Sequence, residues 1–172
     1  MDGILSNSQF YYLAKKAMNT GFSVKAFGPN AGKRAAYTYL VGTAGHGSDV
    51  EPSSAITGKH VKDYALSKED VLSQPDMYLG GWKGGDPERA SLDVTRGMPS
   101  TLKGKKAALT AMIYGNQEAA GHVMRPNTYT QIDNPFYDKE QPQTGRDLSP
   151  AEEAWVHEQT FPLGRRVQDL FR

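Results

Sequence analysis

The sequence predicts an α+β fold, in which a small, mostly antiparallel sheet is covered by helices and followed by an extended C-terminal arm and a terminal helix. Segments in which apolar and polar residues alternate occur in two pairs, and each pair is joined by a Gly-containing turn, which favours β-hairpins. Segments with helical spacing lie before, between and after the two pairs, an order typical of α+β proteins. Residues 125–148 show neither period.

The first part of the chain predicts one helix and one strand pair. Residues 6–21 have an apolar stripe at helical spacing, serines that can cap the start and a glycine that can end the helix. Residues 22–28 and 35–42 are rich in β-strand formers, and we expect them to form a hairpin with a long loop. The polar residues 43–54 predict a loop.

The middle of the chain predicts two short helices and a second hairpin. Residues 57–66 and 67–74 carry the helical patterns, and a proline follows them. The next stretch, MYLGGWKGGDPERASLDVTRG, predicts strands at residues 77–83 and 90–96 around an Asp-Pro turn. Its glycines match neither G-x-x-x-x-G-K-[ST] nor G-x-G-x-x-G, so they give no support to a nucleotide site.

The C-terminal part predicts a helix over residues 102–123, an extended arm and a second helix. The arm, residues 125–148, is rich in Pro, Asn and Gln. The segment that begins Ser149-Pro-Ala-Glu152 has the pattern of a capping box and starts the second helix, which a short amphipathic segment follows. We therefore expect a core domain over residues 1–124, the arm, and a helical tail over residues 149–172.

Composition excludes several classes of site and partner. The chain has 172 residues, a net charge of +1 and no cysteine, so disulfides, zinc–thiolate sites and thiol nucleophiles are excluded. Lys and Arg are spread along the chain, and we expect no specific nucleic-acid partner. No apolar run approaches the roughly 20 residues that span a bilayer, and the N-terminus lacks a secretory pattern, so we expect no membrane contact.

Four polar residues are the candidates if the protein is an enzyme. His46 could act as a general base oriented by Asp49, although the segment GHGSD is more typical of a polar surface loop without a catalytic role. Asp93 could act as an acid or base with Arg96 as an anion clamp, although an ion pair to a neighbouring helix is the simpler interpretation. The histidines lack H-x-x-x-H and H-E-x-x-H spacing, so we expect no metal, and no motif predicts a cofactor.

The arm and the tail carry the residues that we expect to bind protein partners. Spaced apolar side chains on an aperiodic segment fit an arm that lies along another subunit and places one ring in each pocket. The same pattern also fits an arm that wraps its own domain. The candidate partner-binding residues are Tyr129, Ile132, Phe136, Tyr137, Trp155 and Phe171.

Three motifs carry a resemblance to a known family: G-G-W at Gly80–Trp82, L-D-V-T at Leu92–Thr95, and N-Q at Asn116–Gln117. With their surroundings in residues 22–42 and 77–117, they resemble an uncharacterised domain of bacteriophage and mobile-element proteins. That domain is often attached to larger virion-associated or polyvalent proteins. The resemblance covers about half of the chain and implies no catalytic residues.

Two positions depart from the family pattern. Thr38 stands where the pattern has Gly before a tyrosine, and Gly42 stands where it has Ser. Together, the resemblance and the absence of catalytic motifs suggest a phage-encoded, non-enzymatic virion-associated or structural protein whose arm and tail contact other subunits. It would be made in the host cytoplasm and pass into the virion. The alternatives are a small enzyme or injected effector that acts on the host, and an anti-defence protein that sequesters a host factor.

Overall fold

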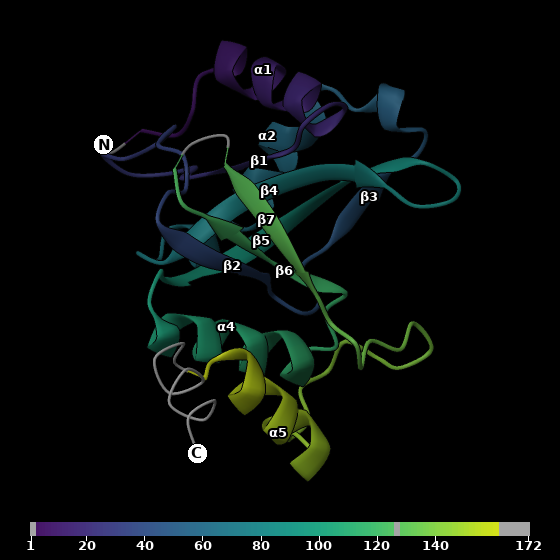
Figure 1. Cartoon of the computed structure of the whole chain (residues 1–172). Coiled ribbons are helices and arrows are strands. Elements are labelled where there is room, and N and C mark those ends of the chain that lie inside the picture. Colours follow the sequence, from purple (N-terminus) through teal and green to yellow (C-terminus); the bar gives the residue numbers. More distant parts are fainter. Residues whose placement is uncertain (1–2, 126–127, 162–172) are drawn as a thin grey trace. The chain divides into compact units, whose positions relative to one another are not determined.

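The structure is a computed structural model, in which residues 3–125 and 128–161 are described. The chain divides into two compact units that are each built from two segments. Unit 1 comprises Met1–Ala36 and Gly45–Gly97, and unit 2 comprises Tyr37–Ala44 and Met98–Arg172. Figure 1 shows both units and labels most of their helices and strands.

Unit 1 contains the first helix, two short helices and four strands. Helix α1 begins at a capping box formed by Ser6 and Gln9, which confirms the predicted start of the first helix. In chain order, the elements of unit 1 are α1 (Asn7–Ala17), β1 (Phe22–Val24), β3 (Ser48–Val50), the 3-10 helix η1 (Ser53–Ala55), α2 (Gly58–Ser67), α3 (Glu69–Leu72), β4 (Met77–Gly84) and β5 (Arg89–Pro99). The last two residues of β5, Met98 and Pro99, belong to unit 2.

The strands of unit 1 pair in the order β1-β4-β5-β3, and each pairing is antiparallel. β4 and β5 form the predicted second hairpin, in which Gly80 lies opposite Asp93. The predicted first hairpin is wrong, because β1 pairs with β4 and residues 38–42 pair elsewhere. The two halves of that segment are joined around one bridge, Val24 to Arg34, by backbone hydrogen bonds such as that from the Ala35 N–H to the Ser23 carbonyl at 2.9 Å. β3 was also not predicted, because its short polar sequence has no alternation to detect.

The core of unit 1 lies between its helices and one face of β4 and β5. Ala90, Leu92 and Val94 of β5 point into it, as the alternation of the sequence predicts. Gly58 lets α2 approach the backbone of Tyr11 on α1, because a β-carbon there would stand 3.0 Å from the Tyr11 Cα. The largest fully buried side chains of unit 1 are Phe10, Val61, Leu72, Leu79, Leu92 and Val94.

Unit 2 contains three antiparallel strands and two helices. Its elements are β2 (Thr38–Gly42), α4 (Leu102–Tyr114), β6 (Ala119–Val123), β7 (Tyr129–Asp133) and α5 (Pro150–Gln159). The strand order is β2-β6-β7, and Thr38 lies opposite Val123. α4 and α5 lie side by side, and the core is formed by Val41, Leu109, Met112, Ile113, Ala120 and Val156.

The predicted helix over residues 102–123 is wrong in its last third. α4 ends at Tyr114, and Asn116 adopts a left-handed backbone conformation with φ +47°. Such a residue stops a helix, and Asn tolerates this conformation better than most side chains. The following Ala119–Val123 segment, whose small residues carry no clear period, then enters the sheet as β6.

The predicted α+β class with a mostly antiparallel sheet is confirmed. The capping box at Ser149 and Glu152 is present, and α5 follows it. Part of the segment predicted as an arm, Tyr129–Asp133, forms β7. Among the described residues, no helix is long and apolar enough to cross a membrane. The amphipathic segment that follows α5, with Phe171, lies outside the described residues.

Candidate functional site

One face of the unit 1 sheet carries polar residues in a row along β5. Ser91, Asp93 and Thr95 occupy this face, opposite the core face. The Ser91 hydroxyl donates to Oδ1 of Asp49 at 2.5 Å, and Asp49 is also 3.0 Å from the Arg89 guanidinium. Asp49 is therefore held by two residues of β5. Ion pairs between exposed carboxylates and arginines are common on protein surfaces, so this contact does not by itself indicate a catalytic role.

Asp93 is the most perturbed carboxylate on this face. Its Oδ1 atom is buried and has no hydrogen-bond partner among the described residues. The side chain lies where a β-carbon on Gly80 would stand, so the glycine makes room for it. Burial raises the pKa of Asp93 from 3.8 to about 6, because the charged form loses its hydration.

His46 lies in the loop before β3. Its backbone carbonyl accepts a 2.5 Å hydrogen bond from the Tyr64 hydroxyl, which ties the loop to α2. Its Nδ1 atom is buried and has no hydrogen-bond partner among the described residues. Burial lowers the pKa of His46, and the nearby Lys68 ammonium lowers it further.

Among the described residues, the hydrogen bonds and ion pairs of the four candidate catalytic residues go to other partners and do not join the four to one another. Asp49 and Asp93 share one sheet face, on which Asp49 is bonded to Ser91 and Arg89. Arg96 is exposed near the other end of β5 and lies opposite Met77. His46 contributes its backbone carbonyl rather than its ring to the hydrogen bond with Tyr64. The arrangement gives Asp93 the environment of an acid or base but no positioned nucleophile.

Unit 2 holds a hydroxyl–imidazole pair that the sequence analysis did not find. Ser100 Oγ and His122 Nε2 lie 2.7 Å apart, and both residues are half-buried. Ser100 precedes α4, and His122 comes from β6. The His122 ring stacks on Tyr39, with ring centroids 4.0 Å apart and planes 10° apart. The partners are distant in sequence, so spacing alone could not indicate the pair.

The segment after β7 is bonded to its own unit. The Asn116 side chain donates to the carbonyls of Asp138 and Gln141 at 2.8 and 3.1 Å, and its Oδ1 accepts from the Asp138 N–H at 3.1 Å. The Asn134 side chain donates to the Gln117 carbonyl at 2.9 Å. Arg146 then makes a bidentate ion pair with the buried Glu152 of α5, at 2.7 Å for both bonds.

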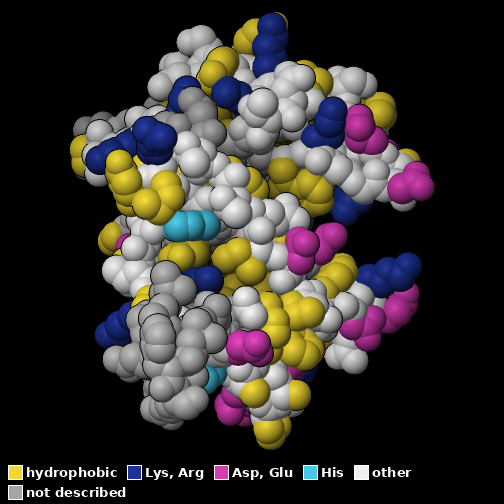
Figure 2. Space-filling model, in the orientation of Figure 1, with side chains coloured by type: hydrophobic (Ala, Val, Ile, Leu, Met, Phe, Trp, Pro, Cys, Tyr) yellow, Lys and Arg dark blue, Asp and Glu magenta, His cyan; other side chains and the backbone are white. Residues whose placement is uncertain are grey.

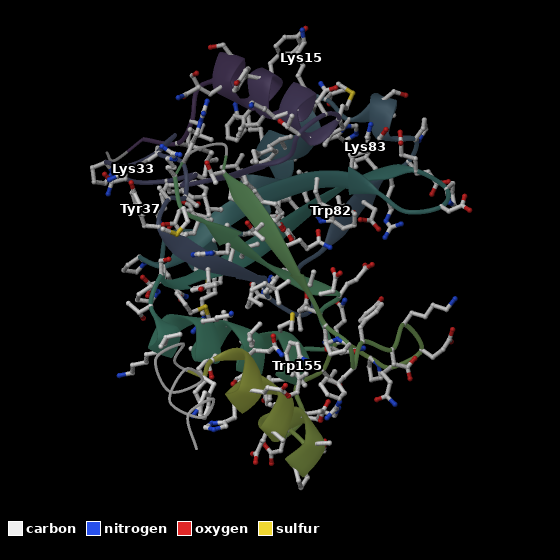
Figure 3. All side chains as sticks on the ribbon, viewed as in Figure 1. Lys15, Lys33, Tyr37, Trp82, Lys83 and Trp155 are labelled. Carbon is white, nitrogen blue, oxygen red and sulfur yellow. The ribbon has the colours of Figure 1, made fainter. Side chains whose placement is uncertain are left out.

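The candidate partner-binding residues that the structure describes divide into two groups. Phe136 and Trp155 pack edge to face, 5.9 Å between centroids, and both contact the unit 2 core together with Ile132. Figure 3 labels Trp155 on α5. Tyr129 is 59% exposed and Tyr137 is 37% exposed. Three of the candidate partner-binding residues thus also pack against the unit's own core, and two tyrosines remain at the surface.

Charge and metal-ligand patterns give no further site. On the face shown in Figure 2, Lys and Arg side chains lie in several separate places, with Asp and Glu among them. Within the described ranges, no group of three or more His, Asp or Glu residues could hold a metal ion.

Comparison with known proteins identifies no family for this chain. No protein-family model matches the chain, and neither does any curated protein or solved structure.

Proposed function

We propose that this protein is a virion-associated or structural protein that contacts other protein subunits through the surface of its arm. The observation that carries the proposal is that the arm is bonded to unit 2 on one side while Tyr129 and Tyr137 are exposed. Tyrosine is enriched at protein interfaces because it buries a large apolar ring and keeps a hydroxyl that can bond to the partner.

The internal bonds of the arm favour binding to a partner. An extended segment that is disordered before binding loses conformational entropy when the complex forms. Here Asn116 and Asn134 hold the backbone of residues 134–141, and the Phe136–Trp155 contact fixes the chain against α5. The entropy loss on binding is correspondingly smaller, and the exposed rings are already positioned.

The biological context of the proposal is a phage or mobile element. It is supported by the resemblance of the G-G-W, L-D-V-T and N-Q motifs to the phage-associated domain. In this context the partner is another subunit of the virion or a second copy of this chain, and the protein passes from the host cytoplasm into the particle. Sequestration of a host factor is the alternative that uses the same surface, and it differs only in the partner.

Site-specific photo-crosslinking tests the proposal and distinguishes these partners. A photoreactive phenylalanine analogue is placed at position 129 or 137 of the full chain, in cells that produce the phage. The control position is Tyr12, which is 49% exposed on α1 and lies outside the arm. We expect crosslinks to virion subunits from positions 129 and 137, and none to the same proteins from position 12.

Two results would contradict the proposal. Equal crosslinking from all three positions would show that the arm has no special role. A chain that forms no crosslink and stays monomeric by light scattering would show that it binds no protein subunit. Crosslinks to one host protein would replace the virion assignment with host-factor sequestration and leave the binding surface in place.

A further inference from the structure

The Ser100–His122 pair has the geometry of a nucleophile and its general base. A hydroxyl becomes a useful nucleophile when a neighbouring imidazole accepts its proton, and the required distance is about 2.6–3.2 Å. Ser100 Oγ lies 2.7 Å from His122 Nε2, within this range. Both side chains are half-buried, so a small molecule in solution can reach them.

The imidazole is held in place and is mostly neutral near pH 7. The His122 ring stacks on the buried Tyr39, and this contact fixes the plane of the imidazole. In many serine hydrolases a carboxylate orients the imidazole instead. Burial lowers the pKa of His122, and the Lys105 ammonium lowers it further. A neutral ring with its proton on Nδ1 can accept the Ser100 proton at Nε2.

Helix α4 begins at Leu102, two residues after the serine. Thr101 is the N-cap residue, and its side chain accepts from the Gly104 N–H at 3.0 Å. The N–H groups of Leu102 and Lys103 at the start of the helix have no i−4 carbonyl to bond. Free N–H groups at a helix N-terminus can stabilise an oxyanion, because they carry the positive end of the helix dipole.

We propose that Ser100 and His122 form an acyl-transfer site that reacts with small activated esters. Ser100 Oγ attacks the ester carbonyl carbon and forms the O–C bond, while its proton passes to His122 Nε2. The carbonyl oxygen becomes an oxyanion near the start of α4. The bond to the leaving alkoxide then breaks, and the alkoxide takes the proton from Nε2. In a second step water attacks the acyl-serine with His122 as base, which releases the acid and restores Ser100.

The small size of the substrate follows from the site. The Met124 sulfur lies 3.4 Å from Ser100 Oγ, so the approach to the hydroxyl is narrowed on that side. A compact acyl group is therefore the class that we expect to react.

The test uses p-nitrophenyl acetate and the full chain. We expect intact-mass measurement to show addition of one acetyl group, and peptide mapping to place it on Ser100. Ser100→Ala should remove this label, and His122→Gln should lower its rate of formation by roughly 100-fold, the usual contribution of a general base. Retention of the wild-type melting temperature by both variants separates lost chemistry from lost folding.

The chain offers a matched control pair. Thr57 Oγ1 and His60 Nδ1 lie 3.0 Å apart in the capping box of α2, and there the hydroxyl already accepts from the His60 N–H. His60→Gln should leave acetylation of Ser100 unchanged. The proposal is overturned if Ser100 is not labelled, or if Ser100→Ala and wild type release nitrophenolate at the same rate.

Discussion

The carboxylate of Asp93 lies against the Cα of Gly80, in the space that any larger residue on β4 would need for its β-carbon. The two residues are direct partners in the β4–β5 ladder, and directly opposed side chains share one face of a sheet. Gly80 therefore allows a charged group to lie close to the sheet, where Oδ1 is buried and without a hydrogen-bond partner among the described residues. Stability should depend on this group.

Asp93→Asn should stabilise the protein at neutral and alkaline pH. The pKa of Asp93 is raised to about 6 in the folded state, whereas the unfolded chain has the ordinary value of 3.8. The folded state thus binds more protons between these values, and the free energy of unfolding falls as pH rises from about 4 to about 6. The resulting loss of unfolding free energy in the wild type is at most about 3 kcal/mol, and it reaches its full size above pH 6. Asp93→Asn should avoid this loss.

Urea denaturation at several pH values measures this effect. We expect the difference between Asp93→Asn and wild type to grow from pH 4 to pH 7 and then stay constant. A difference that is independent of pH would show that Asp93 titrates normally in the folded state. Asp49→Asn serves as the comparison, because Asp49 lies on the same face but is bonded to Ser91 and Arg89.

Gly80→Ala should destabilise unit 1, and Asp93→Ala should relieve much of that loss. The new methyl group collides with the Asp93 carboxylate, and overpacking of this kind costs about 1–3 kcal/mol. In the Asp93→Ala background the space is free, so the same substitution should cost less than 1 kcal/mol or so. A double-mutant cycle from urea midpoints gives the coupling. Additive effects would mean that Gly80 is required by its backbone rather than by Asp93.

Asn116→Ala should release the arm. It removes three hydrogen bonds to Asp138 and Gln141, and it places alanine at φ +47°, which costs about 1–2 kcal/mol in strain. Limited proteolysis should then cut within residues 134–148 faster than in wild type. Asn116→Gly keeps the backbone conformation but loses the bonds, so it should also speed cleavage while destabilising less. Wild-type protection in Asn116→Gly would show that the side-chain bonds do not hold the arm.

Glu152→Gln should destabilise unit 2 by about 1–3 kcal/mol at pH 7, the range for hydrogen bonds to a charged group. Glu152 accepts two bonds from Arg146 and one from the Ser149 N–H, and these lower its pKa from 4.5 to about 2. The stabilisation is present above pH 4.5 and is lost as pH falls towards 2. Arg146 is nearly half exposed, so salt should weaken the effect.

Thermal denaturation of Glu152→Gln against wild type checks this prediction. The two melting temperatures should converge as the pH is lowered from 5 to about 2, because the Glu152 carboxylate of the wild type becomes protonated and then, like the Gln side chain, carries no charge. Glu153→Gln is the matched control, since Glu153 is the next residue on α5 and is exposed. An equal loss of stability in both variants would exclude a specific contribution of the Arg146–Glu152 pair.

Sequence patterns were sufficient to predict the elements whose formation depends on residues close together in the chain. The serine cap at the start of α1, the capping box at Ser149 and the β4–β5 hairpin are all determined within a few residues, and all three were predicted. The partners of β1 and β2 depend on contacts between distant segments. A period-2 pattern identifies a strand but not the strand that it pairs with, so the first hairpin was predicted wrongly.

The candidate site was less accessible to sequence reasoning for the same reason. Asp93 was selected from its position on a polar strand face, and its burial follows from the Gly80 opposite, which the G-G-W motif contains. Ser100 and His122 carry no motif. They meet because the chain turns back after α4 and enters the sheet as β6. The predicted helix over residues 102–123 contains no such turn, so it would not bring His122 close to Ser100.

The division of unit 2 into two chain segments has a consequence for biosynthesis. Thr38 leaves the ribosome long before Val123, its partner in the sheet, so β2 must wait unpaired while all the rest of unit 1 is made. An unpaired strand with buried residues such as Leu40 and Val41 is a point at which nascent chains associate. A fragment that starts at Met98 would lack this strand entirely and leave the β2 side of β6 open, so the two units cannot be expressed as separate contiguous pieces.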